Sequence, residues 1–295
     1  MIAPLLVYWP HYVAQQLGFY AAEDLEIQFA YSDSPSRLVQ ILVSGSGNLG
    51  GPGIDSVISA VERGGAGAEL AIVAGEINKT VYQLITGPSI HGYADLRGQT
   101  LAVVGLREGS TVVLKRMLAA NGLRDGDYDL APVGSSGNRA AAIQNGTVAG
   151  GLLGIPVDLR MTAQGFPSLG LSTDYVPYYP PDAITTRRQW AQQNDAVLVR
   201  FLRAVVRAQR WLNDPANREE AARVGAATTN IPLEEALAAY ELLITRSAAF
   251  PRDGEIDVQG VATVIETMAE SDLLTPPLPG PDKYLDLRYL ERARQ

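Results

Sequence analysis

Residues 95–122, DLRGQTLAVVGLREGSTVVLKRMLAANG, decide the fold because they combine a strand, a glycine-flanked loop and a helix in one unit. The run 100–104 is short and apolar, which predicts a buried strand. Apolar positions at helical spacing follow the loop, with Ser110 or Thr111 as the expected N-cap. The Asn-Gly pair at 121–122 is a typical left-handed stop, so the helix is expected to end there.

The first turn of this helix has the chemistry of an anion site. Its unpaired N–H groups and the positive end of its dipole face the loop that carries Arg107. A cation beside a helix N-terminus suits a carboxylate, a sulfonate or a phosphate. An ordinary βα turn with a surface arginine is an equally good interpretation of the same residues, and the sequence leaves both open.

Composition excludes several classes of protein. The chain has 295 residues, of which 46% are hydrophobic and 19% charged, as in a soluble globular protein of two domains. Its net charge of −8 argues against nucleic acid as a partner. The absence of cysteine excludes disulfides, thiolate catalysis and Cys-ligated metals. No apolar stretch approaches a membrane span, and the first residues lack the features of a secretory signal.

The first third of the chain alternates short strands and helices, which predicts a parallel α/β sheet. The expected elements are a strand at 5–9, a helix at 12–20, a strand at 25–31 and a helix at 36–43. From about residue 185 the pattern becomes helical. A long helix is expected at 196–212, and 231–235 has the proline and acidic residues of a helix start.

A weak internal repeat suggests two lobes of similar build. Residues 37–55 and 139–158 both have the pattern of a helix, a glycine-containing turn, a short strand and a Gly/Pro loop that ends in aspartate. The pattern occurs twice, which fits two lobes better than a tandem array.

Four segments, in this order along the chain, resemble the periplasmic substrate-binding proteins of ABC importers, in the group of sulfonate, taurine, nitrate and thiamine-pyrimidine binders. They are VAQQLGFY at 13–20 with DLEI at 24–27, DLRGQT at 95–100 with GST at 109–111, MLAANGL at 117–123, and LDLRYL at 285–290. Together the four segments extend over nearly the whole chain.

The resemblance implies a bilobed α/β fold of the type II periplasmic-binding-protein class, with two parallel-type sheets flanked by helices and joined by two hinge crossovers. Lobe 1 is expected to comprise 1–86 and 176–295, and lobe 2 is expected to be an insertion at 87–175. The implied function is a solute-binding component that closes on a small organic ligand, anionic or aromatic, without covalent chemistry. The implied partners are the transmembrane permease subunits. A monomer outside the cytoplasm, with its leader not among these residues, is expected.

Ligands of open α/β sheets bind outside the carboxyl ends of the strands, so the loops there supply the expected contacts. Aromatic, hydroxyl and charged side chains in those loops are expected to bind the ligand: Trp9, His11, Tyr12, Ser32, Asp33, Ser34, Gly53, Asp55, Asn78, Arg107, Ser110, Thr111, Pro156 and Tyr175. Trp9 and Tyr12 could equally be core aromatics, because they adjoin apolar positions. No catalytic residue, metal site or cofactor is predicted.

Enzyme and sensor interpretations remain as alternatives. The chain has no Gly-x-Ser-x-Gly, His-Glu-x-x-His or Walker motif, and GSGNLG at 45–50 follows a predicted helix, so it is expected to be a turn. The pyrimidine-synthesising relatives of these binders use a cysteine-rich segment and a histidine, and a chain without cysteine departs from that pattern. A ligand-sensing domain of a receptor would use the same scaffold.

Overall fold

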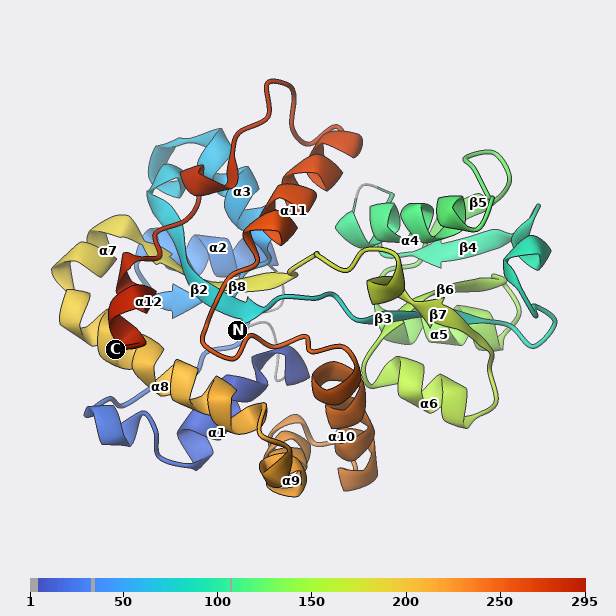
Figure 1. The fold of residues 1–295 in the computed structure, drawn as a ribbon. Coiled ribbons are helices and arrows are strands. Elements are labelled where there is room, and N and C mark those ends of the chain that lie inside the picture. Colours follow the sequence, from blue (N-terminus) through green and yellow to red (C-terminus); the bar gives the residue numbers. More distant parts are fainter. Residues whose placement is uncertain (1–4, 33–34, 107) are drawn as a thin grey trace. The chain divides into compact units, whose positions relative to one another are not determined.

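The computed structural model describes residues 5–32, 35–106 and 108–295 (Figure 1). The chain divides into two compact units, unit 1 (Met1–Lys79, Pro180–Ile265 and Pro277–Gln295) and unit 2 (Thr80–Tyr179 and Glu266–Pro276). The sequence placed the boundaries at 86/87 and 175/176. The first boundary lies earlier in the structure because strand β3 (Tyr82–Thr86) pairs with strands of unit 2, and residues 266–276 also group with that unit.

Unit 1 contains a three-stranded sheet in the order β1-β8-β2. Its strands are β1 (Leu49–Gly50), β2 (Leu70–Ile77) and β8 (Asp182–Arg187), and every residue of β2 is buried. Both pairings are antiparallel, whereas the sequence predicted a parallel sheet here. The difference arises because β8, which follows the first segment of unit 2 (Thr80–Tyr179) in the chain, lies between the other two strands and runs opposite to both.

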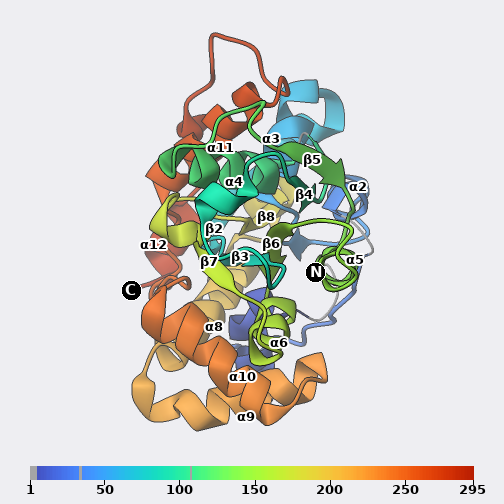
Figure 2. The same ribbon diagram turned by 90° about the vertical axis from the view of Figure 1, so that its right-hand side faces the viewer.

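Helices surround this sheet and supply most of the core of unit 1. Their bounds are α1 (Trp9–Gln16), α2 (Pro35–Ser44), α3 (Ile54–Arg63), α7 (Arg188–Gln193), α8 (Asp195–Leu212), α9 (Arg218–Thr229), α10 (Leu233–Tyr240, followed by a π-helical turn at Glu241–Arg246), α11 (Val258–Glu270, which belongs to unit 1 as far as Ile265) and α12 (Arg288–Ala293). The expected helices at 36–43 and 196–212 are confirmed as α2 and α8. Helices α9 and α10 lie side by side in both views (Figures 1 and 2). Over the described ranges, no helix combines the length and the apolar character that a membrane crossing requires.

Two strands expected in unit 1 are not formed. Residues 5–9 were expected to be a strand, but Leu6–Tyr8 form a short 3-10 helix and α1 begins at Trp9. Pro10 explains the difference, because its fixed φ favours the first turn of a helix. Residues 25–31 were also expected to be a strand, and they pair with no other strand of the described chain.

Unit 2 contains a five-stranded sheet in the order β5-β4-β6-β3-β7. Its strands besides β3 are β4 (Thr100–Val103), β5 (Asp129–Pro132), β6 (Gly150–Gly154) and β7 (Ser168–Leu171), and its helices are α4 (Gly109–Ala120), α5 (Ser136–Gln144) and α6 (Val157–Ala163). Strand β4 is parallel to β5 and β6, as predicted for this part of the chain. Because the crossovers through α4 and α5 run in opposite directions along the sheet, right-handed connections place these helices on opposite faces (Figure 1).

The strand–loop–helix unit of 95–122 is confirmed as β4 and α4, with one correction. The N-cap is Glu108, whereas the sequence favoured Ser110 or Thr111. The Thr111 hydroxyl donates instead to the carbonyl oxygen of Gly105, 2.7 Å away, which ties the helix start to the end of β4. The internal repeat is also confirmed, since α2-β1-α3 and α5-β6-α6 follow the same order.

The packing of α9 on α1 gives a test of the core of unit 1. A Cβ atom added at Gly225 would lie 2.8 Å from the Trp9 indole. Alanine normally stabilises a helix interior relative to glycine, so the contact reverses the usual sign. We expect Gly225→Ala to destabilise the protein by about 1–3 kcal/mol, measured by denaturant unfolding. Gly137→Ala in α5, where the nearest atom is at 3.8 Å, is the control and should not destabilise.

Candidate ligand-binding sites

A buried histidine–glutamate pair lies in unit 1 between helix α1 and strand β2. His11 Nε2 is 2.7 Å from Glu76 Oε2, and His11 Nδ1 is 2.6 Å from the Tyr20 hydroxyl. Glu76 is 1% exposed, and among the described residues its second oxygen, Oε1, has no hydrogen-bond partner. A buried carboxylate oxygen without a partner is unfavourable, so Glu76 is suited to accept a hydrogen bond from a group not present here.

Two further acidic side chains, Asp182 and Asp55, belong to the same part of unit 1 as Glu76. Asp182, at the start of β8, accepts a 3.0 Å hydrogen bond from the N–H of Gly53, and Asp55 lies in the first turn of α3. Burial, then the negative charges of Glu76 and Asp55, raise the pKa of Asp182 to about 8. Burial also raises the pKa of Asp55. This face of unit 1 therefore favours groups that donate hydrogen bonds over anions.

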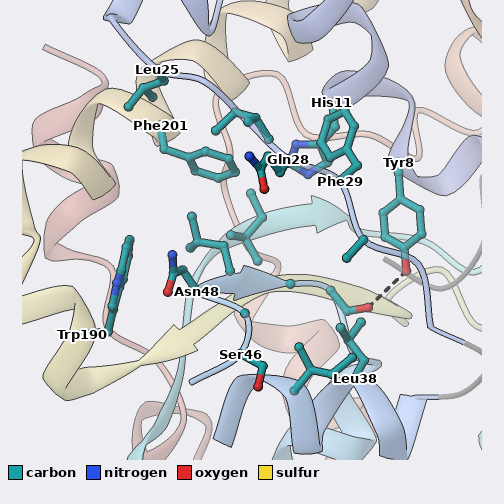
Figure 3. Close-up of a pocket in the computed structure, with 18 of the residues that line it drawn as sticks. Tyr8, His11, Leu25, Gln28, Phe29, Leu38, Ser46, Asn48, Trp190 and Phe201 are labelled. Atoms are coloured by element: carbon teal, nitrogen blue, oxygen red, sulfur yellow. Dashed lines mark hydrogen bonds between the residues drawn. The ribbon is translucent and has the colours of Figure 1, made fainter. Parts of the chain in front are cut away.

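A cavity of about 530 Å³ lies within unit 1 (Figure 3). Two continuous runs, 25–30 and 46–51, line it, together with side chains from the helices and from the sheet. Figure 3 shows Gln28 and Phe29 on one side of the space and Ser46 and Asn48 on the other. Among the described residues, the lining shares His11 with the expected ligand contacts, and it also includes Gly51 and Glu76 from the strand-end loops. The cavity therefore overlaps only in part with the predicted ligand loops.

Unit 2 holds a cationic group at the start of α4. Ser110, Thr111 and Arg139 line a small cavity of about 10 Å³, which is about the size of one water molecule. Arg139 is 3% exposed and donates to the carbonyl oxygens of Gly134 and Leu152 and to the Ser136 hydroxyl. No carboxylate pairs with it among the described residues. Burial lowers the pKa of Arg139, yet a guanidinium stays charged in proteins. This positive charge and the N-terminus of α4 together suit an anion.

Sequence reasoning missed Arg139 and named Arg107 instead, which lies outside the described residues. Arg139 occurs in an alanine-rich helix. The spacing held a clue, since Arg139 and Ile143 are four residues apart and so share a helix face with the core. An arginine on an apolar helix face just after a Ser-Ser-Gly turn was the available sign of a buried cation.

The structure places the other predicted residues as follows. Trp9 is a correction, because its indole is fully buried, donates to the carbonyl oxygen of Ala221 at 2.9 Å and therefore belongs to the core. Tyr12 is 2% exposed, and its hydroxyl donates to the carbonyl oxygen of Leu5 at 3.0 Å. Asp33 and Ser34 lie outside the described residues. Ser32 is buried, whereas partly exposed positions remain open to a ligand: Gly53, Asp55, Asn78, Ser110, Pro156 and Tyr175.

Hydrogen bonds fix several of these side chains. Asn78 bridges unit 1 internally, since its amide nitrogen donates to the carbonyl oxygen of Glu255 and its Oδ1 accepts from the N–H of Asp257. Pro156 follows a cis peptide bond at the start of α6. The Tyr175 ring packs edge-on against Tyr93, with 6.2 Å between ring centroids. Asn78 is therefore held in place by the fold, and Ser110 keeps a hydroxyl to which no hydrogen bond is assigned in the described chain.

The raised pKa of Asp182 gives a pH-dependent test of unit 1. In the unfolded chain this pKa is about 4, so between pH 4 and 8 the native state binds more protons and the contribution of Asp182 to stability falls as pH rises. Asp182→Asn removes this loss and keeps an oxygen for the Gly53 N–H. The measured quantity is the melting temperature of the variant minus that of the unmodified protein. We expect this difference to increase from pH 5 to pH 8 and to level off above pH 9.

Asp129→Asn is the matched control, because Asp129 is exposed and makes no side-chain hydrogen bond within the described chain. Its difference from the unmodified protein should not change over the same pH range. If the Asp182→Asn difference were also constant, Asp182 would titrate in the ordinary range for an aspartate, and the carboxylate cluster would not act as described.

Comparison with known proteins agrees with the two-unit α/β architecture. Over 150 residues the chain is 29% identical to the nitrate/nitrite binding protein NrtA of Synechococcus elongatus, covering 48% of this chain and 33% of that protein. It is 27% identical over 145 residues to the 4-amino-5-hydroxymethyl-2-methylpyrimidine phosphate synthase of Schizosaccharomyces pombe, covering 48% of this chain and 40% of the synthase. The matches thus span less than half the length of either relative.

The fold is also that of a solved periplasmic binding protein. The structure of the periplasmic aliphatic sulphonate binding protein SsuA from Escherichia coli superposes with a TM-score of 0.74 at 19% identity, covering 94% of this chain and 88% of that one. The family model described as NMT1/THI5 like matches residues 7–218, which is more than half of the chain. The protein therefore belongs to the NMT1/THI5-like family and has the fold of the periplasmic binding proteins.

Proposed function

We propose that this protein is the solute-binding component of an ABC import system and that its solute is a small organic molecule with an anionic group. The family and the fold support solute binding in general. The observation that carries the finer proposal is Arg139, a buried cation without a carboxylate partner in the described part of the chain, beside the N-terminus of α4. A cation withdrawn from water is unfavourable unless it is compensated, and a bound anion would supply that compensation.

Ser110 and Arg107 are the proposed direct contacts. Ser110 is in the first turn of α4, partly exposed, and lines the same small cavity as Arg139. Arg107, from the loop before α4, supplies a second positive charge in the proposal. Arg139 then acts mainly by its field, because its N–H groups are already engaged by Gly134, Leu152 and Ser136.

The remainder of the solute is proposed to contact Tyr175 of the same unit, whose ring would contact apolar or aromatic atoms. In this proposal the protein works outside the cytoplasm as a monomer and delivers its solute to permease subunits. Closure of the hinge on the ligand, with no covalent change to it, stays a prediction.

Binding is tested by calorimetry and thermal shift with alkyl and aryl sulfonates, taurine, nitrate, aromatic carboxylates, pyrimidines and riboflavin. A ligand that binds the native state raises the melting temperature. We expect a shift with at least one anionic member and recovery of that compound unchanged. Conversion of a compound would instead favour an enzyme like the pyrimidine phosphate synthase. A shift with neutral compounds alone would contradict the anionic class, and silence across the panel would favour a sensor with another ligand.

Two substitutions locate the anion site once a ligand is found. Ser110→Ala removes one hydrogen bond to a charged group, worth about 1.5–3 kcal/mol, so affinity should fall roughly tenfold to a hundredfold. Arg107→Ala should weaken binding by a similar factor without changing the melting temperature of the free protein. Ser168→Ala in β7 is the control, since its exposed hydroxyl has no assigned partner in the described chain. Unchanged affinity in both variants would rule out this site.

A further inference from the structure

The cavity of unit 1 contains an acidic side chain that the described fold satisfies only in part. Glu76 lines this cavity of about 530 Å³ and is 1% exposed. Its Oε2 atom is 2.7 Å from His11 Nε2, whereas its Oε1 atom has no hydrogen-bond partner in the described chain. Because a buried acceptor without a donor is unfavourable, the site favours a ligand that brings a donor to Glu76.

The hydrogen bonds around His11 assign its protons. Tyr20 is 2% exposed, and the one partner of its hydroxyl among the described residues is His11 Nδ1, 2.6 Å away. The hydroxyl must donate to Nδ1, since its hydrogen would otherwise be buried without an acceptor. The imidazole is then neutral, and it donates its own hydrogen from Nε2 to Glu76 Oε2. The negative charge of the Glu76 carboxylate is therefore not offset by His11.

The rest of the lining is also suited to a cation. No lysine or arginine is among the described residues that line the cavity, and a second acidic residue, Glu26, is. Aromatic rings attract cations to their faces, and four of them line the space: Tyr8, Phe29, Trp190 and Phe201. Figure 3 shows Trp190 at one end of the space and Tyr8 at the other. Charge and ring chemistry together favour an organic cation over an anion.

The cavity has the size and the access that a small molecule needs. Its volume of about 530 Å³ lies within the usual range of small-molecule sites. Gln28, Ser46 and Asn48 line it and are exposed, so the cavity opens to solvent beside them. Figure 3 shows Gln28 on one side of the space and Asn48 on the other. A ligand can therefore enter past polar side chains and place one end beside the buried Glu76.

We propose that this cavity is a second ligand site, which takes a primary ammonium ion carried on an apolar or aromatic body. The ammonium group donates to Glu76 Oε1, the aromatic rings cover the body, and the side-chain amides of Gln28 and Asn48 contact the outer end. A hydrogen bond between two charged groups is among the strongest in proteins, and the ammonium ion supplies the positive charge that His11 does not.

The site differs from the proposed anion site in its residues and in the sign of its charge. It belongs to unit 1, whereas Ser110 and Arg139 belong to unit 2. The inference does not depend on the proposed transport function or on the anionic class of the solute. Failure of either proposal leaves the other standing.

The first test compares three probes with the same phenyl body by calorimetry and thermal shift: phenethylammonium, 2-phenylethanol and 3-phenylpropionate. We expect phenethylammonium to bind at millimolar concentration and to raise the melting temperature. The uncharged alcohol should bind roughly tenfold more weakly, because it lacks the charge-assisted hydrogen bond. Absence of binding by phenethylammonium, or equal affinity for the alcohol, would overturn the proposal. Binding of 3-phenylpropionate that Ser110→Ala weakens and Glu76→Gln does not would belong to unit 2.

The second test removes the charge of Glu76 and keeps its shape. Glu76→Gln retains an oxygen for the His11 Nε2–H, so the free protein should melt no lower than the unmodified one. The affinity for phenethylammonium should fall roughly tenfold to a hundredfold, while that for 2-phenylethanol stays unchanged. Glu26→Gln is the matched control, since Glu26 lines the cavity but is exposed, and it should change affinity by about twofold at most. Unchanged phenethylammonium affinity in Glu76→Gln would contradict the assignment.

A third test places the ligand by filling the space. Val197, on α8, is partly exposed and lines the cavity, so Val197→Phe occupies part of the volume without entering the core. We expect it to weaken phenethylammonium binding by about tenfold or more. Val43→Phe is the control, because Val43, on α2, is also partly exposed and is not in the lining. If Val197→Phe bound phenethylammonium as well as the control does, the ligand would lie elsewhere and the proposal would be wrong.

Discussion

The ladder between β2 and β8 is the interaction on which unit 1 depends. The two strands come from distant parts of the chain, and every residue of β2 is buried. Their pairing places Glu76, near the end of β2, in the same part of the unit as Asp182, at the start of β8, and β8 in turn holds β1 on its other side. This ladder positions the acidic side chains, the start of α3 and the cavity, because β8 is the central strand of a sheet of three.

Charge is distributed differently in the two units. Unit 1 concentrates acidic side chains around Glu76; burial raises the pKa of Asp55, and burial together with the charges of Glu76 and Asp55 raises the pKa of Asp182. Unit 2 holds an arginine withdrawn from water at a helix N-terminus, where dipole and guanidinium have the same sign. The positive charge of unit 2 is the reason that the anion site is proposed there and not beside the acidic side chains of unit 1.

The cavity in unit 1 shows why volume alone does not identify a ligand site. A space of this size, with aromatic and apolar walls, meets the general description of a small-molecule pocket. Its lining also includes His11, which is an expected ligand contact, and Gly51 and Glu76 from the strand-end loops, so the groups that line the space say more about a ligand than its volume does.

Local patterns in the sequence were enough to predict β4, α4, α2, α8 and the repeated helix–strand–helix order, since each depends on hydrophobic periodicity and turn residues within about twenty positions. The prediction of a strand at 25–31 was wrong, because a strand needs a neighbouring strand and no local signal states whether one is present. The same limit applies to the sites. The sequence identified the helix start at Ser110 and Thr111, because capping and dipole chemistry are local. Only the tertiary structure decided that Arg139 is buried near this helix start and that Trp9 belongs to the core. It also decided that the charges of Glu76 and Asp55 act on the pKa of Asp182. The reason is that burial and long-range electrostatics depend on which segments fold against one another.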